Sequence, residues 1–129
     1  MGKQKSSGKM VAIKLLLNSF TDEYQAKKVL SEIQILRQLS TMKSNVFTTK
    51  LEDVIASTNP EKISYIFIVM EHVDSDLKKV FNTTQNIEFN EEHVITILYN
   101  TLCAMSFLHS ANIMHRDIKP ANILVDVEC

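Results

Sequence analysis

Hydrophobic and polar positions alternate in two different ways in the first half of the chain. Residues 10–16 are mostly β-branched or apolar around a single lysine, Lys14, which predicts a strand. Apolar residues then recur at helical spacing behind two candidate N-caps, Ser19 and Thr21. This stripe contains Ala26, Val29, Leu30, Ile33, Leu36 and Leu39. The pattern therefore predicts a strand and then an amphipathic helix, with Glu32 at the border of its buried stripe.

A hairpin and a break in the pattern follow this helix. Residues 46–55 have the pattern of a bent strand, and residues 57–61 carry turn chemistry. Residues 63–70 are apolar on both faces, which is typical of an interior strand. The polar stretch 71–76 then interrupts the pattern, so we expect a boundary between two lobes there.

The second half of the chain is mainly helical. Residues 76–81 predict a short helix, and the polar residues 82–90 predict a loop. A long helix capped by Asn90 should follow and end between residues 109 and 112. Its apolar stripe contains Val94, Ile97, Leu98, Leu102, Met105 and Leu108. Strands and helices together predict an α+β fold.

Composition and charge exclude several classes of protein. The chain has 129 residues, of which 45% are hydrophobic, and its 14 basic and 15 acidic residues give a net charge of -1. General binding to nucleic acid is therefore not expected. The two cysteines lack metal-ligand spacing, and no segment approaches the ~18 apolar residues of a membrane span. We expect a soluble protein of the cytoplasm, the nucleus or both.

The segment from His115 to Asn122 carries the clearest chemical signal. Asp117, Lys119 and Asn122 stand at short fixed offsets between apolar residues. Phosphoryl transfer needs an acceptor for the substrate proton, a cation near the phosphate and oxygen ligands for Mg²⁺. These three residue types meet those needs. The simpler alternative is a surface turn with a chance ion pair between Arg116 and Asp117.

This segment resembles the catalytic loop of eukaryotic protein kinases, and residues 11–14 resemble the strand that carries the family's ATP-binding lysine. The resemblance implies that Asp117 is the catalytic base, Lys119 a contact to the transferred phosphate and Asn122 a Mg²⁺ ligand. It also implies a packing role for His115. ATP and Mg²⁺ are the implied cofactors.

The same resemblance implies a set of ATP-binding residues on both sides of the lobe boundary. Lys14 would contact the phosphates, Glu32 would hold Lys14, and Met70 would be the residue that limits access beside the adenine. The full set is Lys14, Glu32, Ala12, Met70, Glu71, Val73, Asp76 and Leu124. The resemblance further implies that Lys14 and Glu32 face Asp117 and Asn122 across one nucleotide.

Two features narrow the resemblance to a subgroup. A lysine two positions after the aspartate, as in Asp117 and Lys119, is the pattern of serine/threonine kinases. Asp76 and Leu77 resemble the Asp-Leu pair that follows the hinge in mitogen-activated protein kinases, with cyclin-dependent kinases as the next most similar group. The implied partners are a protein substrate and an upstream activating kinase; the oligomeric state is left open.

The chain also departs from the kinase pattern. Residues 1–70 resemble part of the N-lobe without its glycine-rich loop or its first two strands, 71–76 the hinge, and 77–129 the start of the C-lobe. No Asp-Phe-Gly follows Val125. We therefore expect an incomplete two-lobed fold that exposes apolar surface on its long helix, with marginal stability and no activity in isolation.

Three functions are compatible with these observations. The first is a serine/threonine kinase of the mitogen-activated type. The second is a truncated, catalytically inactive kinase-like chain that acts as a binding or regulatory fragment. The third, a small-molecule phosphotransferase of related fold, is disfavoured because Lys119 and the hinge pattern are typical of protein kinases.

Overall fold

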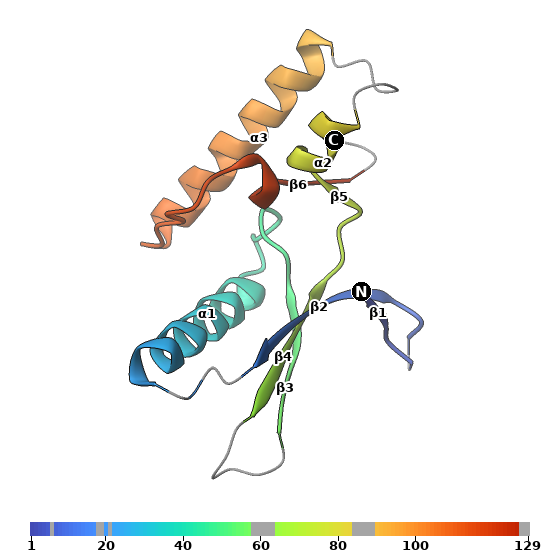
Figure 1. The fold of residues 1–129 in the computed structure, drawn as a ribbon. Coiled ribbons are helices and arrows are strands. Elements are labelled where there is room, and N and C mark those ends of the chain that lie inside the picture. Colours follow the sequence, from blue (N-terminus) through green and yellow to red (C-terminus); the bar gives the residue numbers. More distant parts are fainter. Residues whose placement is uncertain (6, 18–19, 21, 58–63, 84–89, 127–129) are drawn as a thin grey trace. The chain divides into compact units, whose positions relative to one another are not determined.

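Four antiparallel strands form one sheet in the first part of the chain. They are β1 (Gly2–Lys3), β2 (Met10–Leu17), β3 (Leu51–Ala56) and β4 (Tyr65–Glu71), in the spatial order β1-β2-β4-β3 (Figure 1). β4 is therefore an interior strand, as its apolar residues on both faces predicted. Its pairing with β3 confirms the predicted hairpin.

The computed structural model describes residues 1–5, 7–17, 20, 22–57, 64–83 and 90–126. Most of the predicted turn at 57–61 and most of the loop at 82–90 lie outside these residues. The chain divides into two units, Met1–His72 and Val73–Cys129. With an antiparallel sheet in the first and helices in both, the predicted α+β class is confirmed.

Strand β1 was not predicted from the sequence. β1 pairs with β2, with Gly2 opposite Val11 and Lys3 opposite Met10. The turn between them is closed by backbone hydrogen bonds from the Gln4 N–H to the Lys9 carbonyl and from the Gly8 N–H to the Gln4 carbonyl. Gly8 has a φ of 73°, which favours glycine. Two residues are too few to show a period, so this strand left no signal in the sequence.

Helix α1 (Glu23–Thr41) confirms the predicted amphipathic helix but begins at a different cap. The side chain of Asp22 accepts a hydrogen bond from the Gln25 N–H at 2.8 Å, which makes Asp22 the N-cap. The predicted caps Ser19 and Thr21 lie outside the described residues. The Asp22 carboxylate also lies at the positive end of the helix dipole, where a negative charge is stabilising.

The core of the first unit lies between α1 and one face of the sheet. Val29 of α1 packs with Ile66 and Ile68 of β4, and Ile68 is fully buried. Partly buried apolar residues surround them: Leu16, Phe20, Ile33, Leu36, Leu51, Val54 and Met70. Leu30, which the pattern placed in the buried stripe, is 55% exposed. The helix buries a narrower face than the sequence suggested.

Strand β3 begins later than the predicted start at residue 46. Val46 is 83% exposed, and the preceding Asn45 is buried. The Asn45 Oδ1 accepts hydrogen bonds from the N–H groups of Phe47 and Thr48 at 3.1 and 3.2 Å. A side chain that bonds the backbone two and three residues ahead forms a turn, and this turn delays the strand to Leu51.

In the second unit, a two-stranded ribbon joins segments that are far apart in the sequence. β5 (Ser75–Asp76) pairs antiparallel with β6 (Leu124–Val125). Helix α2 (Leu77–Asn82) follows β5, and a 3₁₀ turn, η1 (Pro120–Asn122), precedes β6. The Leu77 N–H donates to the Ile123 carbonyl at 2.9 Å, so the two segments are also joined beyond the ribbon.

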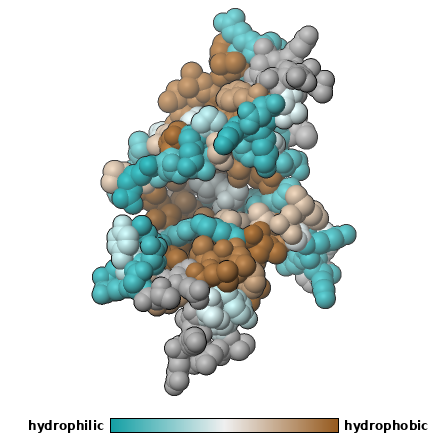
Figure 2. Space-filling view, viewed as in Figure 1, coloured by the Kyte–Doolittle hydropathy of each residue, from teal (hydrophilic) through white to brown (hydrophobic). Residues whose placement is uncertain are grey.

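Helix α3 (Glu91–Ser110) is capped by Asn90, as predicted, and leaves much of its apolar surface open. Only Leu108 of the predicted stripe is buried, whereas Val94, Leu98 and Leu102 are each more than half exposed. Figure 2 shows hydrophobic residues on the surface over α3, as expected from the sequence. Among the described residues, no helix combines the length and apolar character needed to span a bilayer.

The end of α3 is fixed by a left-handed residue, Asn112, with a φ of 57°. The Asn112 N–H donates to the His109 carbonyl at 3.0 Å, and the Ile113 N–H donates to the Leu108 carbonyl at 2.9 Å. This pair of bonds is a Schellman motif, which satisfies carbonyls at the helix end. It also turns the chain toward the polar loop that starts at His115.

Substitution of Asn112 tests this helix end. Asn112→Val is expected to lower the free energy of unfolding by about 1–2 kcal/mol, because β-branched residues disfavour positive φ. Asn112→Gly is expected to match or exceed the wild-type stability. Urea unfolding followed by circular dichroism measures both variants. Equal stability of the Val and Gly variants would show that the left-handed conformation contributes nothing.

Candidate active site

An ion pair joins β2 to α1 at the predicted ATP-binding lysine. The Lys14 Nζ lies 2.6 Å from the Glu32 Oε1. Lys14 pairs with Ile68 in the antiparallel register, so both side chains lie on the face of the sheet that packs against α1. Glu32 stands three residues after the buried Val29 and therefore borders this face. Both charged side chains are partly exposed and can meet a ligand from solvent.

Two further predicted nucleotide residues lie on this face. Ala12 and Met70 are register partners on β2 and β4, so their side chains are neighbours on the same face as Lys14. Glu71 ends β4, and its N–H donates to the Lys50 carbonyl at 2.9 Å. The first unit therefore brings together Ala12, Lys14, Glu32, Met70 and Glu71 in neighbouring elements.

The predicted catalytic loop is organised around the carboxylate of Asp117. Its Oδ2 accepts hydrogen bonds from the Lys119 Nζ and the Asn122 Nδ2, each at 2.8 Å. The Asn122 Nδ2 also donates to the Asp117 carbonyl at 2.9 Å. The simpler alternative predicted a pair with Arg116, but the ion pair of Asp117 is with Lys119. The three residues thus form one cluster.

Arg116 has an unusual backbone conformation, with a φ of 61°. Non-glycine residues rarely occupy the left-handed region, because the Cβ atom crowds the backbone there. Strained residues of this kind are concentrated at functional sites. Asp117 follows this strained residue directly. The Asp117 N–H donates a hydrogen bond to the His115 Nδ1 at 3.3 Å.

The remaining predicted residues belong to the ribbon of the second unit. Asp76 and Leu124 are register partners on β5 and β6. The Asp76 carboxylate caps α2, accepting from the Lys79 N–H at 2.9 Å, and it also pairs with the Lys79 ammonium at 3.2 Å. Val73 is the first residue of this unit. Asp76 therefore has a local structural role in addition to any role toward a ligand.

The pKa values of two aspartates at the site are lowered, for different reasons. The hydrogen bond from Lys119, followed by that from Asn122, lowers the pKa of Asp117. The backbone N–H of Lys79 is the main cause of the lowered pKa of Asp76. Both carboxylates are therefore ionised at neutral pH.

An acid titration separates these two causes. Because each pKa is below its value of 3.8 in a model peptide, each carboxylate stabilises the folded state above that pH and loses this effect as the pH falls through its folded-state pKa. Lys119→Met should raise the pKa of Asp117, whereas Lys79→Met should leave most of the shift at Asp76. Carboxyl-carbon NMR titration measures both. Equal recovery of the two pKa values would contradict the assignment.

The donor set near Asp117 fits a Mg²⁺ ion only in part. Within the described ranges, no group of three or more His, Cys, Asp or Glu side chains could hold a metal ion. Asn122 uses its amide nitrogen for both bonds to Asp117, which leaves Oδ1 as a hard oxygen ligand. Mg²⁺ bound with nucleotides takes few protein ligands and several oxygens from phosphates and water. Asn122 is compatible with such a site.

One ion pair beside the predicted hinge was not identified from the sequence. The Lys9 Nζ lies 2.6 Å from the Glu52 Oε1, across 43 positions of sequence. The hydrogen bond to Glu52 raises the pKa of Lys9. A lysine before one strand and a glutamate inside another form no recognisable motif. The ion pair therefore could not be predicted from a local sequence pattern.

Comparison with known proteins supports the kinase interpretation. The model of the protein kinase domain matches residues 1–128. "Mitogen-activated protein kinase 5" of Oryza sativa subsp. indica is 38% identical over 120 residues, 93% of this chain and 31% of the relative. "Mitogen-activated protein kinase 13" of Arabidopsis thaliana is 34% identical over 119 residues, 92% of this chain and 31% of the relative.

A further relative, "Mitogen-activated protein kinase 3" of Arabidopsis thaliana, is 34% identical over 123 residues, 95% of this chain and 32% of the relative. The chain thus spans about a third of the length of these curated relatives. They confirm the predicted similarity to mitogen-activated protein kinases. Because the family model covers nearly every residue, the chain belongs to the protein kinase domain family.

Proposed function

We propose that this chain is part of a mitogen-activated-type serine/threonine protein kinase, which transfers the γ-phosphate of ATP to a protein hydroxyl. The observation that carries the proposal is the Asp117 Oδ2, which accepts hydrogen bonds from both Lys119 and Asn122. One short loop therefore contains a carboxylate that can accept a proton, a cation and an amide oxygen that can bind a metal ion. Membership of the protein kinase domain family supports the same chemistry.

Asp117 would act on the substrate hydroxyl. Its carboxylate is ionised at neutral pH, since Lys119 and Asn122 lower its pKa. It can accept the hydrogen bond of a serine or threonine hydroxyl, orient the oxygen and take up its proton. Lys119 would stabilise negative charge that develops on the transferred phosphoryl group. At 61% exposure, the Asp117 side chain is open to a substrate.

Nucleotide binding would use the residues that the sequence predicted for it. Lys14, held by Glu32, would contact the phosphates, and Ala12, Met70, Val73 and Leu124 would contact the adenine together with the backbone of Glu71. Asp76 would bond the ribose. Mg²⁺, when bound, would neutralise phosphate charge, and Asn122 would hold it through Oδ1. The domain assignment stays a prediction: N-lobe part at 1–70, hinge at 71–76 and start of the C-lobe at 77–129.

The partners follow from this chemistry. A protein that presents a serine or threonine hydroxyl would be the substrate, and an upstream kinase would be the activator. We place this protein in the cytoplasm or nucleus and expect it to meet both partners there. These proposals rest on the similarity to mitogen-activated protein kinases. This chain spans about a third of the length of those relatives.

Binding of Mg-ATP to the 129-residue chain tests the nucleotide part of the proposal. Lys14→Met is expected to weaken binding about 10- to 100-fold, which is the usual effect of losing a charged hydrogen bond. Lys27→Met is the matched control, because it breaks another 2.6 Å lysine-glutamate pair on α1. Isothermal titration calorimetry measures both. Equal effects of the two variants, or no binding by the wild type, would overturn the nucleotide site.

Phosphoryl transfer itself is a separate measurement. The chain, and any longer natural product that contains it, should be incubated with radiolabelled ATP and a mixed peptide pool. Labelling of serine or threonine that disappears when Asp117 is substituted supports the proposed kinase function. ATP binding without any transfer in the longer product supports the alternative of an inactive binding fragment.

A further inference from the structure

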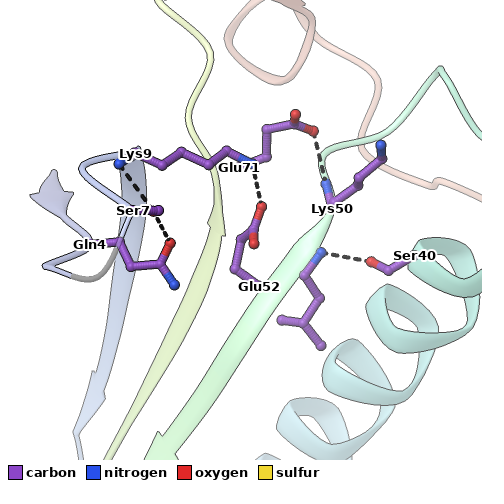
Figure 3. A network of polar contacts seen from close by, with 8 residues as sticks. Gln4, Ser7, Lys9, Ser40, Lys50, Glu52 and Glu71 are labelled. Atoms are coloured by element: carbon purple, nitrogen blue, oxygen red, sulfur yellow. Dashed lines mark hydrogen bonds and ion pairs between the residues drawn. The ribbon is translucent and has the colours of Figure 1, made fainter.

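The backbone of Lys9 is held by the turn between β1 and β2. Its carbonyl accepts a hydrogen bond from the Gln4 N–H at 2.9 Å, and its N–H donates to the Ser7 Oγ at 3.2 Å. Ser7 in turn donates to the Gln4 side chain at 2.5 Å (Figure 3). The start of the Lys9 side chain is therefore fixed, although the residue itself lies on the surface.

The partner of Lys9 lies at an irregularity of β3. The register between β3 and β4 shifts between Leu51 and Asp53, which makes Glu52 an extra residue in the ladder. Such bulges redirect the side chain of the extra residue. Because β4 lies between β2 and β3, the 2.6 Å bond from Lys9 to Glu52 spans the central strand near its end (Figure 3).

Glu71, the last residue of β4, is hydrogen-bonded to Lys50, which directly precedes β3. Its N–H donates to the Lys50 carbonyl at 2.9 Å, and its Oε2 accepts from the Lys50 N–H at 3.3 Å. β3 is joined to α1 here as well, since the Leu51 N–H donates to the Ser40 Oγ at 2.6 Å. These bonds fix β3 and β4 to each other at the point where the chain leaves the sheet.

We propose that Lys9 and Glu52 form a strap across β4 that positions the backbone of Glu71. The inference deepens the proposed function and rests on it, because that function assigns the Glu71 backbone to the adenine of ATP. Lys9 and Glu52 are then positioning residues that contact no substrate. Lys50 and the neighbouring strands also restrain this end of β4.

The expected effect is small but specific. The Lys9 and Glu52 side chains are 46% and 27% exposed, so water and salt weaken their attraction. We expect loss of the ion pair to change the hydrogen-exchange rate of the Glu71 amide and the affinity for Mg-ATP by about two- to fivefold, as for other exposed pairs. The loss of affinity should come from the contacts with adenine, because the strap positions Glu71 and not Lys14, the residue proposed to contact the phosphates.

Three variants of the 129-residue chain test the strap: Lys9→Met, Glu52→Gln and the swap Lys9→Glu/Glu52→Lys. Lys5→Met is the matched control, because it removes one positive charge from the same turn. The first measurement is hydrogen exchange of the Glu71 amide by NMR, which needs no nucleotide. Exchange about two- to fivefold faster in both single variants, restored in the swap, is expected. Unchanged exchange in both, or an equal change in Lys5→Met, would overturn the proposal.

The second measurement compares the affinity for Mg-ATP with that for inorganic tripolyphosphate. The strap predicts weaker ATP binding in both single variants, unchanged tripolyphosphate binding and recovery in the swap. An equal loss for both ligands would refute the adenine-side role. If the wild type binds no ATP, the proposed nucleotide site fails, and the exchange measurement still decides whether the strap positions Glu71.

Discussion

Asp117→Asn is expected to slow phosphoryl transfer to serine or threonine by about 10²- to 10⁴-fold, the range for loss of a general base. Asparagine keeps the size of the side chain but cannot take up the substrate proton. It also removes the charge that pairs with Lys119 at 2.8 Å. The measurement is the initial rate of labelled phosphate transfer by the longest active natural product that contains this chain, at saturating ATP.

Affinity for ATP separates this role from a structural one. It should change little in Asp117→Asn, because the proposed role of Asp117 is to act on the substrate hydroxyl and not on the nucleotide. Asp53→Asn, the same change at an exposed position of β3, is the control and should retain the wild-type rate. A full rate in Asp117→Asn would remove Asp117 from the mechanism. Loss of ATP affinity together with the rate would point to disruption of the loop.

Strong periodicity accounts for the elements that the sequence predicted well. α1 and α3 carry apolar residues at helical spacing over 19 and 20 residues, and β4 is apolar on both faces. Long periodic segments leave few alternatives, because the wrong structure would expose the whole stripe. β1 has only two residues, and β3 is delayed by a side-chain turn. Neither effect leaves a period to detect.

The site shows the same division between local and distant signals. The cluster of Asp117, Lys119 and Asn122 spans six positions, so the sequence alone could place its members together. Lys14 and Glu32 are 18 positions apart, and the resemblance to kinases paired them. The pair of Lys9 and Glu52 depends on strand order and on a bulge, neither of which residue spacing encodes. Such contacts require the structure.

Asn45→Leu is expected to have the largest effect on stability, lowering the free energy of unfolding by about 2–5 kcal/mol. Asn45 is only 3% exposed. Its Nδ2 donates to the Leu39 carbonyl at 3.0 Å and the Thr48 Oγ1 at 2.7 Å, while Oδ1 accepts from two backbone N–H groups. Leucine removes all four bonds, including the two that hold the backbone N–H groups of Phe47 and Thr48 in the turn. Urea unfolding followed by circular dichroism measures the loss.

Asn100→Leu makes the same chemical change at an exposed position of α3 and should alter stability by less than about 0.5 kcal/mol. Thr48→Val removes only one of the four bonds and should have an intermediate effect. The graded series distinguishes loss of the hydrogen-bonded turn from a general effect of added hydrophobicity. Equal stability of Asn45→Leu and Asn100→Leu would mean that the turn between α1 and β3 does not depend on Asn45. The position of β3, and with it the end of the sheet near Glu71, would then need another explanation.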